Sequence, residues 1–160
     1  MEYLNKMQYH KLTDYLISVL PKAYQNNFYS WIDSAEMLNE GRNVTVDYIE
    51  LMHLQYDTTF YFEDLPFRQI KPVEIMAHIQ TWLYENDPER YQLELANPQC
   101  TIELIDDKVA TVEFSISFQE KITAQESENG DLTLNGKKYQ LGNVEIYYAK
   151  EFEIIPKRIE

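Results

Sequence analysis

The chain has 160 residues, a net charge of −13 and a single cysteine, Cys100. This length suits one hydrophobic core, so residues 1–160 are expected to form a single domain. The charge disfavours specific binding of nucleic acid, because phosphate groups would be repelled, but it fits both plain solubility and a basic partner. Without a second cysteine no intrachain disulfide forms, and Cys100 is expected to be a small buried apolar residue rather than a nucleophile.

The N-terminus is polar and lacks the apolar segment of a secretory signal. No apolar run approaches the roughly 20 residues that a membrane helix needs. We therefore expect a protein that is made and folds in a reducing cytoplasm and has no membrane partner.

The chain begins with a predicted helix over residues 2–20. Leucine and valine recur there at spacings of three and four, which places them on one helix face. The stripe consists of Leu12, Leu16, Val19 and Leu20, with Tyr9 and Tyr15 beside it. Pro21 ends the helix, because proline has no backbone N–H to donate.

Residues 28–32 predict a short strand. Met37 and Leu38 extend this strand past an irregularity at Asp33 and Ser34. Residues 39–43 then predict a turn in which Gly41 is free to adopt a positive φ.

The segment over residues 44–86 is the part around which the rest of the fold is expected to form. Residues 44–63 predict a long strand with one buried and one wet face, because its even positions are mostly apolar. These positions are Val44, Val46, Tyr48, Met52, Leu54, Tyr56, Phe60 and Phe62. Ile49 and Leu51 break the alternation around Glu50, which predicts a bulge or bend. Glu63 and Asp64 predict an acidic turn.

Residues 71–86 predict an amphipathic helix that lies across the buried face of this strand and has Pro72 in its first turn. The apolar stripe consists of Val73, Met76, Ala77, Ile79, Gln80 and Leu83, widened by Ile75 and Trp82. Its packing on the strand is expected through Val73, Met76, Ile79 and Leu83. The helix ends before Pro88, because the residue before a proline disfavours the α conformation.

The remainder of the chain predicts strands. Residues 91–95 alternate as in a strand, and residues 101–105 and 109–118 predict a hairpin that turns at Asp106, Asp107 and Lys108. In its second strand, Val112, Phe114, Ile116 and Phe118 share one face.

Three further segments follow this hairpin. Residues 125–130 predict a polar, mobile loop, and residues 131–141 a small hairpin with a type I′ turn at Asn135 and Gly136. Residues 144–155 predict a final aromatic strand. The order of elements favours an α+β fold, in which an antiparallel or mixed sheet carries two main helices on one face.

No motif predicts catalysis or metal binding. His10, His53 and His78 have no histidine or cysteine at ligand spacing, and neither HExxH nor CxxC is present. The chain also lacks a phosphate loop, a dinucleotide fingerprint and a GxSxG motif. We therefore expect no catalytic residue, no metal site and no cofactor.

Several short segments together carry a resemblance. The predicted helix ends in the pattern W-L-x-E-N-x-P at residues 82–88, and the hairpin strand reads V-E-F-S-I-S-F at residues 112–118. The L-T-D at residues 12–14 and the aromatic segment at residues 145–152 fit the same pattern. Over most of its length the chain resembles the phage tail completion protein R family of contractile-tailed temperate phages and prophages.

The resemblance implies a structural protein of the virion with a tail-terminator-like α+β fold. Such proteins complete the head-proximal end of the tail, stop growth of the tube and sheath, and present a surface to the head connector. The resemblance also implies self-association as a ring, typically a hexamer, with tail tube, sheath and head completion proteins as the other partners. The implied location is the virion tail, and the host cytoplasm during assembly.

Exposed aromatic side chains are enriched at protein interfaces, so they are candidates for contacts between subunits or with the tail. The candidates are Trp31, Tyr61, Tyr147, Tyr148 and Phe152, each of which also fits a core position. A ring needs two different patches that meet by rotation. The strand predicted over residues 144–155 either supplies such a patch or completes the sheet of its own chain.

Two other functions stay open. The first is a non-catalytic acidic adaptor of a bacterial host or prophage that binds a basic partner. The second is a small hydrolase, for which the adjacent carboxylates would have to hold a divalent ion. Those pairs, Asp106 with Asp107 and Glu63 with Asp64, fit solvated turns better.

Overall fold

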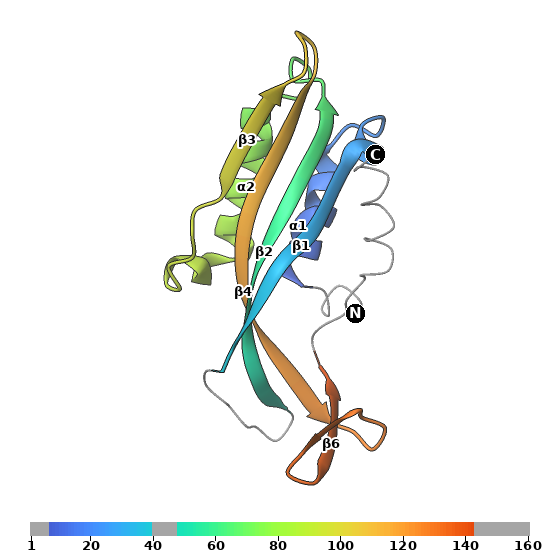
Figure 1. Ribbon diagram of the computed structural model, residues 1–160, viewed down its shortest axis with the longest axis vertical. Helices are drawn as coiled ribbons and strands as arrows, with labels where there is room; N and C mark the ends of the chain where they lie inside the picture. The colour runs from blue at the N-terminus through green and yellow to red at the C-terminus, as the bar shows by residue number, and fades with distance from the viewer. Residues whose placement is uncertain (1–6, 40–47, 143–160) are drawn as a thin grey trace.

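The computed structural model describes residues 7–39 and 48–142. In this part of the chain, two α-helices and an antiparallel sheet form an α+β fold (Figure 1). The helices are α1 (Gln8–Val19) and α2 (Pro72–Asn86). The strands are β1 (Phe28–Leu38), β2 (Ile49–Leu65), β3 (Gln99–Leu104), β4 (Ala110–Glu126), β5 (Leu132–Leu134) and β6 (Lys137–Leu141). Two short 3-10 helices, η2 (Gln25–Asn27) and η3 (Pro88–Tyr91), lie in the connections.

Some predicted segments lie outside the described residues. They are the start of the first helix before residue 7, most of the turn at residues 39–43, the positions Val44 and Val46, and the final strand at residues 144–155. The α+β class and the placement of both helices on one face are confirmed, and the sheet is antiparallel throughout the described part.

The sheet has the strand order β1-β2-β4-β6-β5, and β3 also pairs with β4. β2 and β4 have 17 residues each and pair along nearly their whole length. One edge of β4 is taken by β2, so β3 and β6 must share the other edge. β3 pairs with the beginning of β4 and β6 with its end.

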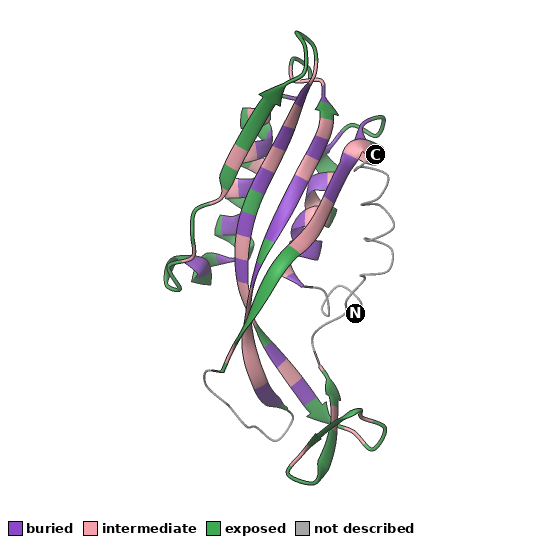
Figure 2. Ribbon diagram, viewed as in Figure 1, coloured by how far each residue is buried: buried purple, intermediate pink, exposed green. Residues whose placement is uncertain are grey.

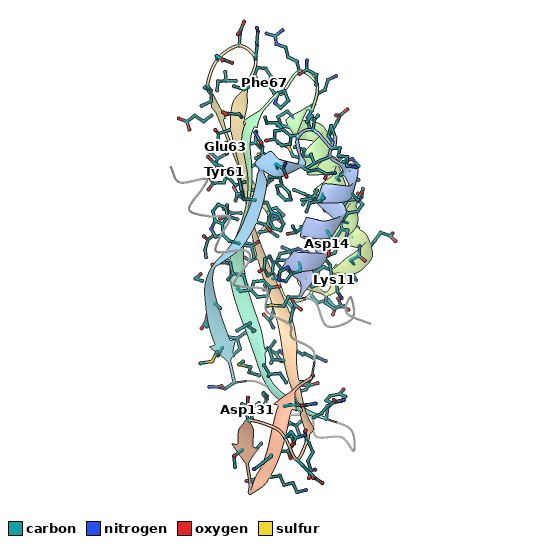
Figure 3. The ribbon with its side chains drawn as sticks, turned by 90° about the vertical axis from the view of Figure 1, so that its right-hand side faces the viewer. Lys11, Asp14, Tyr61, Glu63, Phe67 and Asp131 are labelled. Atoms are coloured by element: carbon teal, nitrogen blue, oxygen red, sulfur yellow. The ribbon has the colours of Figure 1, made fainter. Side chains whose placement is uncertain are left out.

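Both helices cover the same face of the sheet, since they lie behind it in Figure 1 and on one side of it in Figure 3. Buried and more exposed residues alternate along the central strands, as Figure 2 shows. Apolar side chains of the helices and of β2 and β4 form one core. Its fully buried members include Leu12, Leu16, Tyr56, Phe60, Phe62, Leu65, Leu83, Val112, Ile116 and Phe118.

Beyond the helices the sheet continues as a twisted arm (Figure 1). We use this name for residues 49–53 of β2, residues 121–126 of β4, and the hairpin of β5 and β6. At its tip, Asn135 and Gly136 both have positive φ, 54° and 78°. These are the dihedrals of a type I′ turn, so the predicted hairpin turn is confirmed. β4 runs on to Glu126, so the connection expected at residues 125–130 is shorter and begins at Ser127.

Bulges explain where the alternation of apolar residues breaks. β1 shifts register between Ile32 and Ser34, as predicted, and β2 shifts between Glu50 and Met52, also as predicted. Each bulge inserts one extra residue and so changes which positions face the helices. Glu63 and Asp64 do not form a turn but a third irregularity inside β2, where Asp64 has a φ of 47°.

The end of α1 differs from the sequence prediction. Leu12 and Leu16 are buried, and Leu20 adopts extended dihedrals before Pro21, as expected. Val19 is 37% exposed, so its assignment to the buried stripe was wrong. It lies in the last turn of α1 and lines a surface cavity of about 160 Å³ between α1 and Glu74, Ile75 and His78 of α2.

α2 presents a face to the core that is rotated from the predicted one. Ile75, Ile79, Trp82 and Leu83 are buried, whereas Val73 is 65% exposed. The assignment of Val73 to the packing face was therefore wrong. The helix carries apolar residues on more than one side, and burying Ile75 and the large ring of Trp82 turns Val73 outward.

The strand predicted over residues 91–95 does not form. This segment ends η3 and continues as turns, with Leu93 N donating to Glu89 O at 3.0 Å and Leu95 N to Arg90 O at 3.1 Å. The buried side chain of Arg90 sets this conformation. Its guanidinium donates to Asp87 Oδ2 at 2.8 Å and lies 5.7 Å from the ring centre of Phe118.

Replacing Leu83 with alanine tests the helix packing. The side chain is 1% exposed, so Leu83→Ala is expected to lower the free energy of unfolding by about 2–5 kcal/mol, measured by urea denaturation. Val73→Ala is the matched control on the same helix and should cost less than about 0.5 kcal/mol. Equal losses for the two variants would contradict the observed helix face.

Candidate assembly surface

Aromatic side chains gather on the sheet face opposite the helices, which we call the open face. Trp31 of β1 and Tyr61 of β2, both predicted as interface residues, have ring centres 6.0 Å apart. Tyr61 is labelled on this side of the sheet in Figure 3. Tyr29 lies beside them, 6.4 Å from Tyr61, because β1 pairs Tyr29 directly with Tyr61. Sequence reasoning missed Tyr29, although it alternates with Trp31 along the same strand.

Two carboxylates, Asp33 and Asp57, accept hydrogen bonds from the polar side chains of the open face. Asp33 accepts hydrogen bonds from Trp31 Nε1 at 2.8 Å and from Thr59 Oγ1 at 2.5 Å. Asp57 accepts from Ser117 Oγ at 2.5 Å and from Ser34 Oγ at 3.3 Å. These bonds link β1, β2 and β4 across the face and fix the orientation of the indole of Trp31. This face is therefore an ordered arrangement of aromatic, hydroxyl and carboxylate groups, in which Trp31 and Tyr61 are partly exposed and Tyr29 and Thr59 are buried.

The three other predicted interface residues lie in the segment that follows β6. Tyr147, Tyr148 and Phe152 are outside the described residues. Of the five candidates, the structure thus places two, Trp31 and Tyr61, and it places them next to each other.

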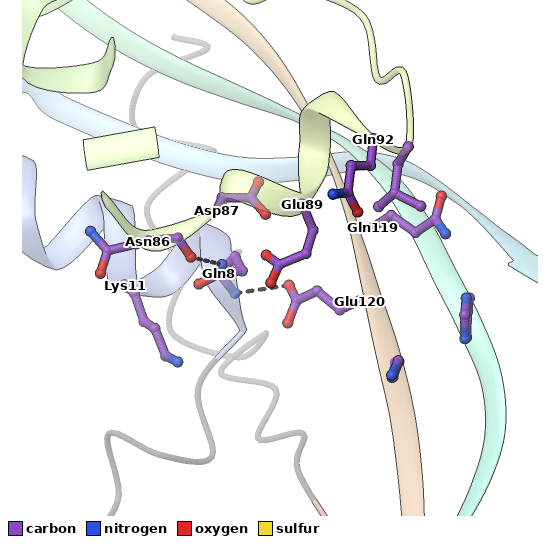
Figure 4. Close-up of a pocket in the computed structure, with 11 residues that line it drawn as sticks. Gln8, Lys11, Asn86, Asp87, Glu89, Gln92, Gln119 and Glu120 are labelled. Atoms are coloured by element: carbon purple, nitrogen blue, oxygen red, sulfur yellow. Dashed lines mark hydrogen bonds between the residues drawn. The ribbon is translucent and has the colours of Figure 1, made fainter. Parts of the chain in front are cut away.

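A pocket of about 490 Å³ lies where the arm leaves the helix-covered part of the sheet (Figure 4). We call it the junction pocket. Its walls come from Gln8 and Lys11 of α1, from Asn86 and Asp87 at the end of α2, and from residues 119–121 of β4. Gln8 Nε2 donates to Asn86 O at 2.8 Å, which joins the start of α1 to the end of α2.

Glu120 is the central charged group of this pocket. Its carboxylate accepts a hydrogen bond from the backbone N–H of Gln8 at 2.8 Å and another from the hydroxyl of Tyr56. The N–H of Gln8 is one of the unpaired donors at the beginning of α1, and no side chain of α1 itself caps it. Burial raises the pKa of Glu120, while the two hydrogen bonds act against this rise. Burial also raises the pKa of Tyr56 well above its ordinary value.

Asp87 and Arg90 form a buried ion pair at the other wall of the pocket. The distance between Arg90 Nη1 and Asp87 Oδ2 is 2.8 Å, and both residues are at most 5% exposed. Burial raises the pKa of Asp87, and the hydrogen bond from Arg90 opposes this rise. Removing one partner would leave the other charge buried alone, which makes the pair a fixed part of the fold.

The histidines lie apart from one another. His10 is buried on α1, His78 Nδ1 lies 2.9 Å from the hydroxyl of Tyr15, and His53 Nε2 lies 3.8 Å from Glu50 Oε1. Among residues 7–39 and 48–142, no three His, Cys, Asp or Glu side chains come together as a metal site would require. No described helix is long and apolar enough to cross a membrane.

The remaining candidates for chemistry have structural roles. Asp106 Oδ1 accepts hydrogen bonds from the backbone of Lys108 and Val109, at 2.7 and 2.8 Å, and these lower its pKa. It therefore closes the turn between β3 and β4, as predicted. Cys100 is half-buried against the core, and burial raises the pKa of its thiol, which is the opposite of what a nucleophile needs.

The raised pKa of Glu120 predicts a pH dependence of stability. As the pH rises above the ordinary glutamate pKa of 4.5, the carboxyl group of Glu120 stays protonated to a higher pH in the folded state than in the unfolded state. The contribution of Glu120 to stability therefore falls as the pH rises. Glu120→Gln removes this contribution, so the unfolding free energy of the variant minus that of the wild type should increase from about pH 4 to pH 7 in urea titrations.

Tyr56→Phe is the matched comparison, because it removes the hydrogen bond that lowers the pKa of Glu120. This variant should lose stability more steeply than the wild type as the pH rises. A difference between Glu120→Gln and wild type that stays flat or decreases with pH would contradict the assignment.

The family model of the P2 phage tail completion protein R (GpR) matches residues 6–142. The chain is also 43% identical over 155 residues to the "Uncharacterized 19.2 kDa protein in rep-hol intergenic region" of Haemophilus phage HP1 (strain HP1c1), a match that covers 97% of this chain and 93% of that protein. No solved structure matches the chain. With well over half of its residues matched, the chain belongs to the P2 phage tail completion protein R family.

Proposed function

We propose that the chain completes the head-proximal end of a contractile phage tail. In this role it stops growth of the tail tube and sheath and presents the surface to which the head docks. The family match over residues 6–142 is the observation that carries the proposal. The whole chain, residues 1–160, acts in it as one tail-completion domain, assembled in the host cytoplasm and retained in the virion.

The role is structural rather than catalytic. The ionisable side chains of the junction pocket support this view, because each of the buried ones is engaged in holding elements together. Glu120 receives the first N–H of α1, and Asp87 binds Arg90. A catalytic pair instead needs two groups that both reach a substrate and titrate separately.

The active form is a ring, with six copies as the expected number, that contacts the tube and sheath proteins on one side and a head completion or connector protein on the other. The open-face residues Trp31 and Tyr61 supply aromatic contact area for one of these surfaces. The segment at residues 144–155, with Tyr147, Tyr148 and Phe152, acts as a second assembly element.

Disrupting the gene for this chain in a lysogen tests the tail-completion role. We expect induced lysates to contain heads and separate tails, with tails of abnormal length, in electron micrographs. A plasmid copy should restore complete particles, and so should copies carrying His53→Ala or His78→Ala if no histidine is catalytic. Tails of normal length that join heads without the chain would contradict the proposal.

Removing the chain from Val144 onward tests the last segment. We expect the shortened protein to remain folded, because residues 7–142 contain the core described above, and to fail in completing tails. Folding is measured by circular dichroism and urea denaturation, and completion by particle counts. A shortened protein that does not fold would assign the segment to the core of its own chain instead.

A further inference from the structure

β1 and β3 are edge strands on opposite sides of the sheet, and each has one side without a partner strand among the described residues. Among the described strands, β3 pairs only with β4, and β1 only with β2. Five of the six residues of β3 are exposed, and so are residues 34–37 of β1. An edge strand presents backbone N–H and C=O groups that a further strand can bond, and natural edges are commonly blunted by lysine or proline. Neither residue type occurs in β3 or in residues 34–38.

Apolar side chains follow both edges on the helix side. Ile102 and Leu104 of β3 are 47% and 68% exposed, and Met37 of β1 is 67% exposed. Their register partners, such as Val112 opposite Ile102 and Leu54 opposite Met37, lie on the same face. These exposed residues therefore continue the apolar face of the sheet beyond the body of one subunit.

The backbone groups of these residues also point outward. Ile105 N donates to Val109 O, which directs that residue toward β4, and the direction alternates along an antiparallel strand. Ile102 and Leu104 consequently turn their N–H and C=O groups away from β4. The registers of β3 on β4, β4 on β2 and β2 on β1 extend this alternation to β1. The N–H and C=O groups of Ala35 and Met37 therefore also point away from β2.

We propose that β3 of one copy pairs with residues 34–38 of β1 in the next copy. This inference rests on the proposed ring and names the joint between its subunits. Three antiparallel pairings separate β1 from β3, so the two strands run in opposite directions. A neighbouring copy related by a rotation thus offers its β1 antiparallel to β3. Ile102 is level with Val112 of β4 and Ala35 with Phe118, so this joint offsets neighbouring copies along the strands and inclines the strands to the rotation axis, as in a β-barrel. A joint between two different edges repeats from copy to copy, and it forms a ring when the rotation closes.

The charges disfavour one alternative register. Pairing Ala35 with Ile102 and Met37 with Cys100 joins apolar residues on one face. On the other face it places Glu36 opposite Thr101, and Ser34 opposite Glu103. A shift of two residues would put Glu36 directly opposite Glu103, and like charges at opposed positions are destabilising. In a chain with a net charge of −13, avoiding this contact favours the first register.

The native Cys100 provides a direct test. Opposed residues of a hydrogen-bonded antiparallel pair have Cα atoms about 5.5 Å apart, which a disulfide can span. Tails carrying Met37→Cys are treated with a mild oxidant and run on a non-reducing gel, alongside the purified protein. We expect a ladder of covalent oligomers that extends past the dimer. The ladder should be absent in the wild type and in Met37→Cys combined with Cys100→Ser.

Ile102→Cys combined with Cys100→Ser is the matched control for a different arrangement, in which β3 of two copies pairs about a two-fold axis. That arrangement would give a single dimer band, and such a band overturns the proposal. Completed tails that contain Met37→Cys protein without any ladder also overturn it, while the tail-completion role stands. The gene disruption described above tests that role separately, because it requires no particular joint.

Discussion

The antiparallel pair of β2 and β4 is the constraint on which the rest of the structure depends. Its backbone hydrogen bonds hold two 17-residue strands in one register, from Ile49 opposite Ala124 to Leu65 opposite Ala110. Because side chains alternate between the faces, the register gathers Phe60, Phe62 and Phe114 on one side. That apolar face must be covered, and α1 and α2 cover it. The pair is longer than the helices, so its remainder becomes the arm.

The sequence predicts the parts of this fold that depend on local signals, such as the alternation of apolar residues along a strand or the residue types of a turn. The hairpin of β3 and β4, the proline at the start of α2 and the Asn135–Gly136 turn each carry a local signal, and each is confirmed. The buried even positions of β2 are confirmed at Tyr56, Phe60 and Phe62, whereas Tyr48 is 38% exposed and its assignment to the buried face was wrong. The errors arise where distant contacts decide. Val73 and Ile75 are both apolar, so the stripe alone does not fix the helix face. The turns after η3 depend on the burial of Arg90 against Asp87 and Phe118, which no local pattern reveals.

In the candidate assembly surface, too, the contacts between residues far apart in the sequence could not be predicted from local patterns. Aromatic character marked Trp31 and Tyr61, but their contact depends on the register of β1 on β2. That register is reset by the extra residue at Asp33. The role of Glu120 was not predictable, because the carboxylate caps a helix that begins 112 residues earlier in the chain. Family resemblance carried the functional prediction, while composition and spacing alone indicated only a non-catalytic α+β domain.

The acidity of the chain limits how copies of it can meet. Each copy carries a net charge of −13, and carboxylates brought together at a joint repel with little screening within a Debye length of about 8 Å at physiological salt. Backbone hydrogen bonds and apolar contacts avoid this cost, since neither brings net charges together. β3 and residues 34–38 of β1 contain one carboxylate each, Glu103 and Glu36, and the proposed register does not place these two directly opposite each other, so an edge-to-edge joint meets little charge repulsion.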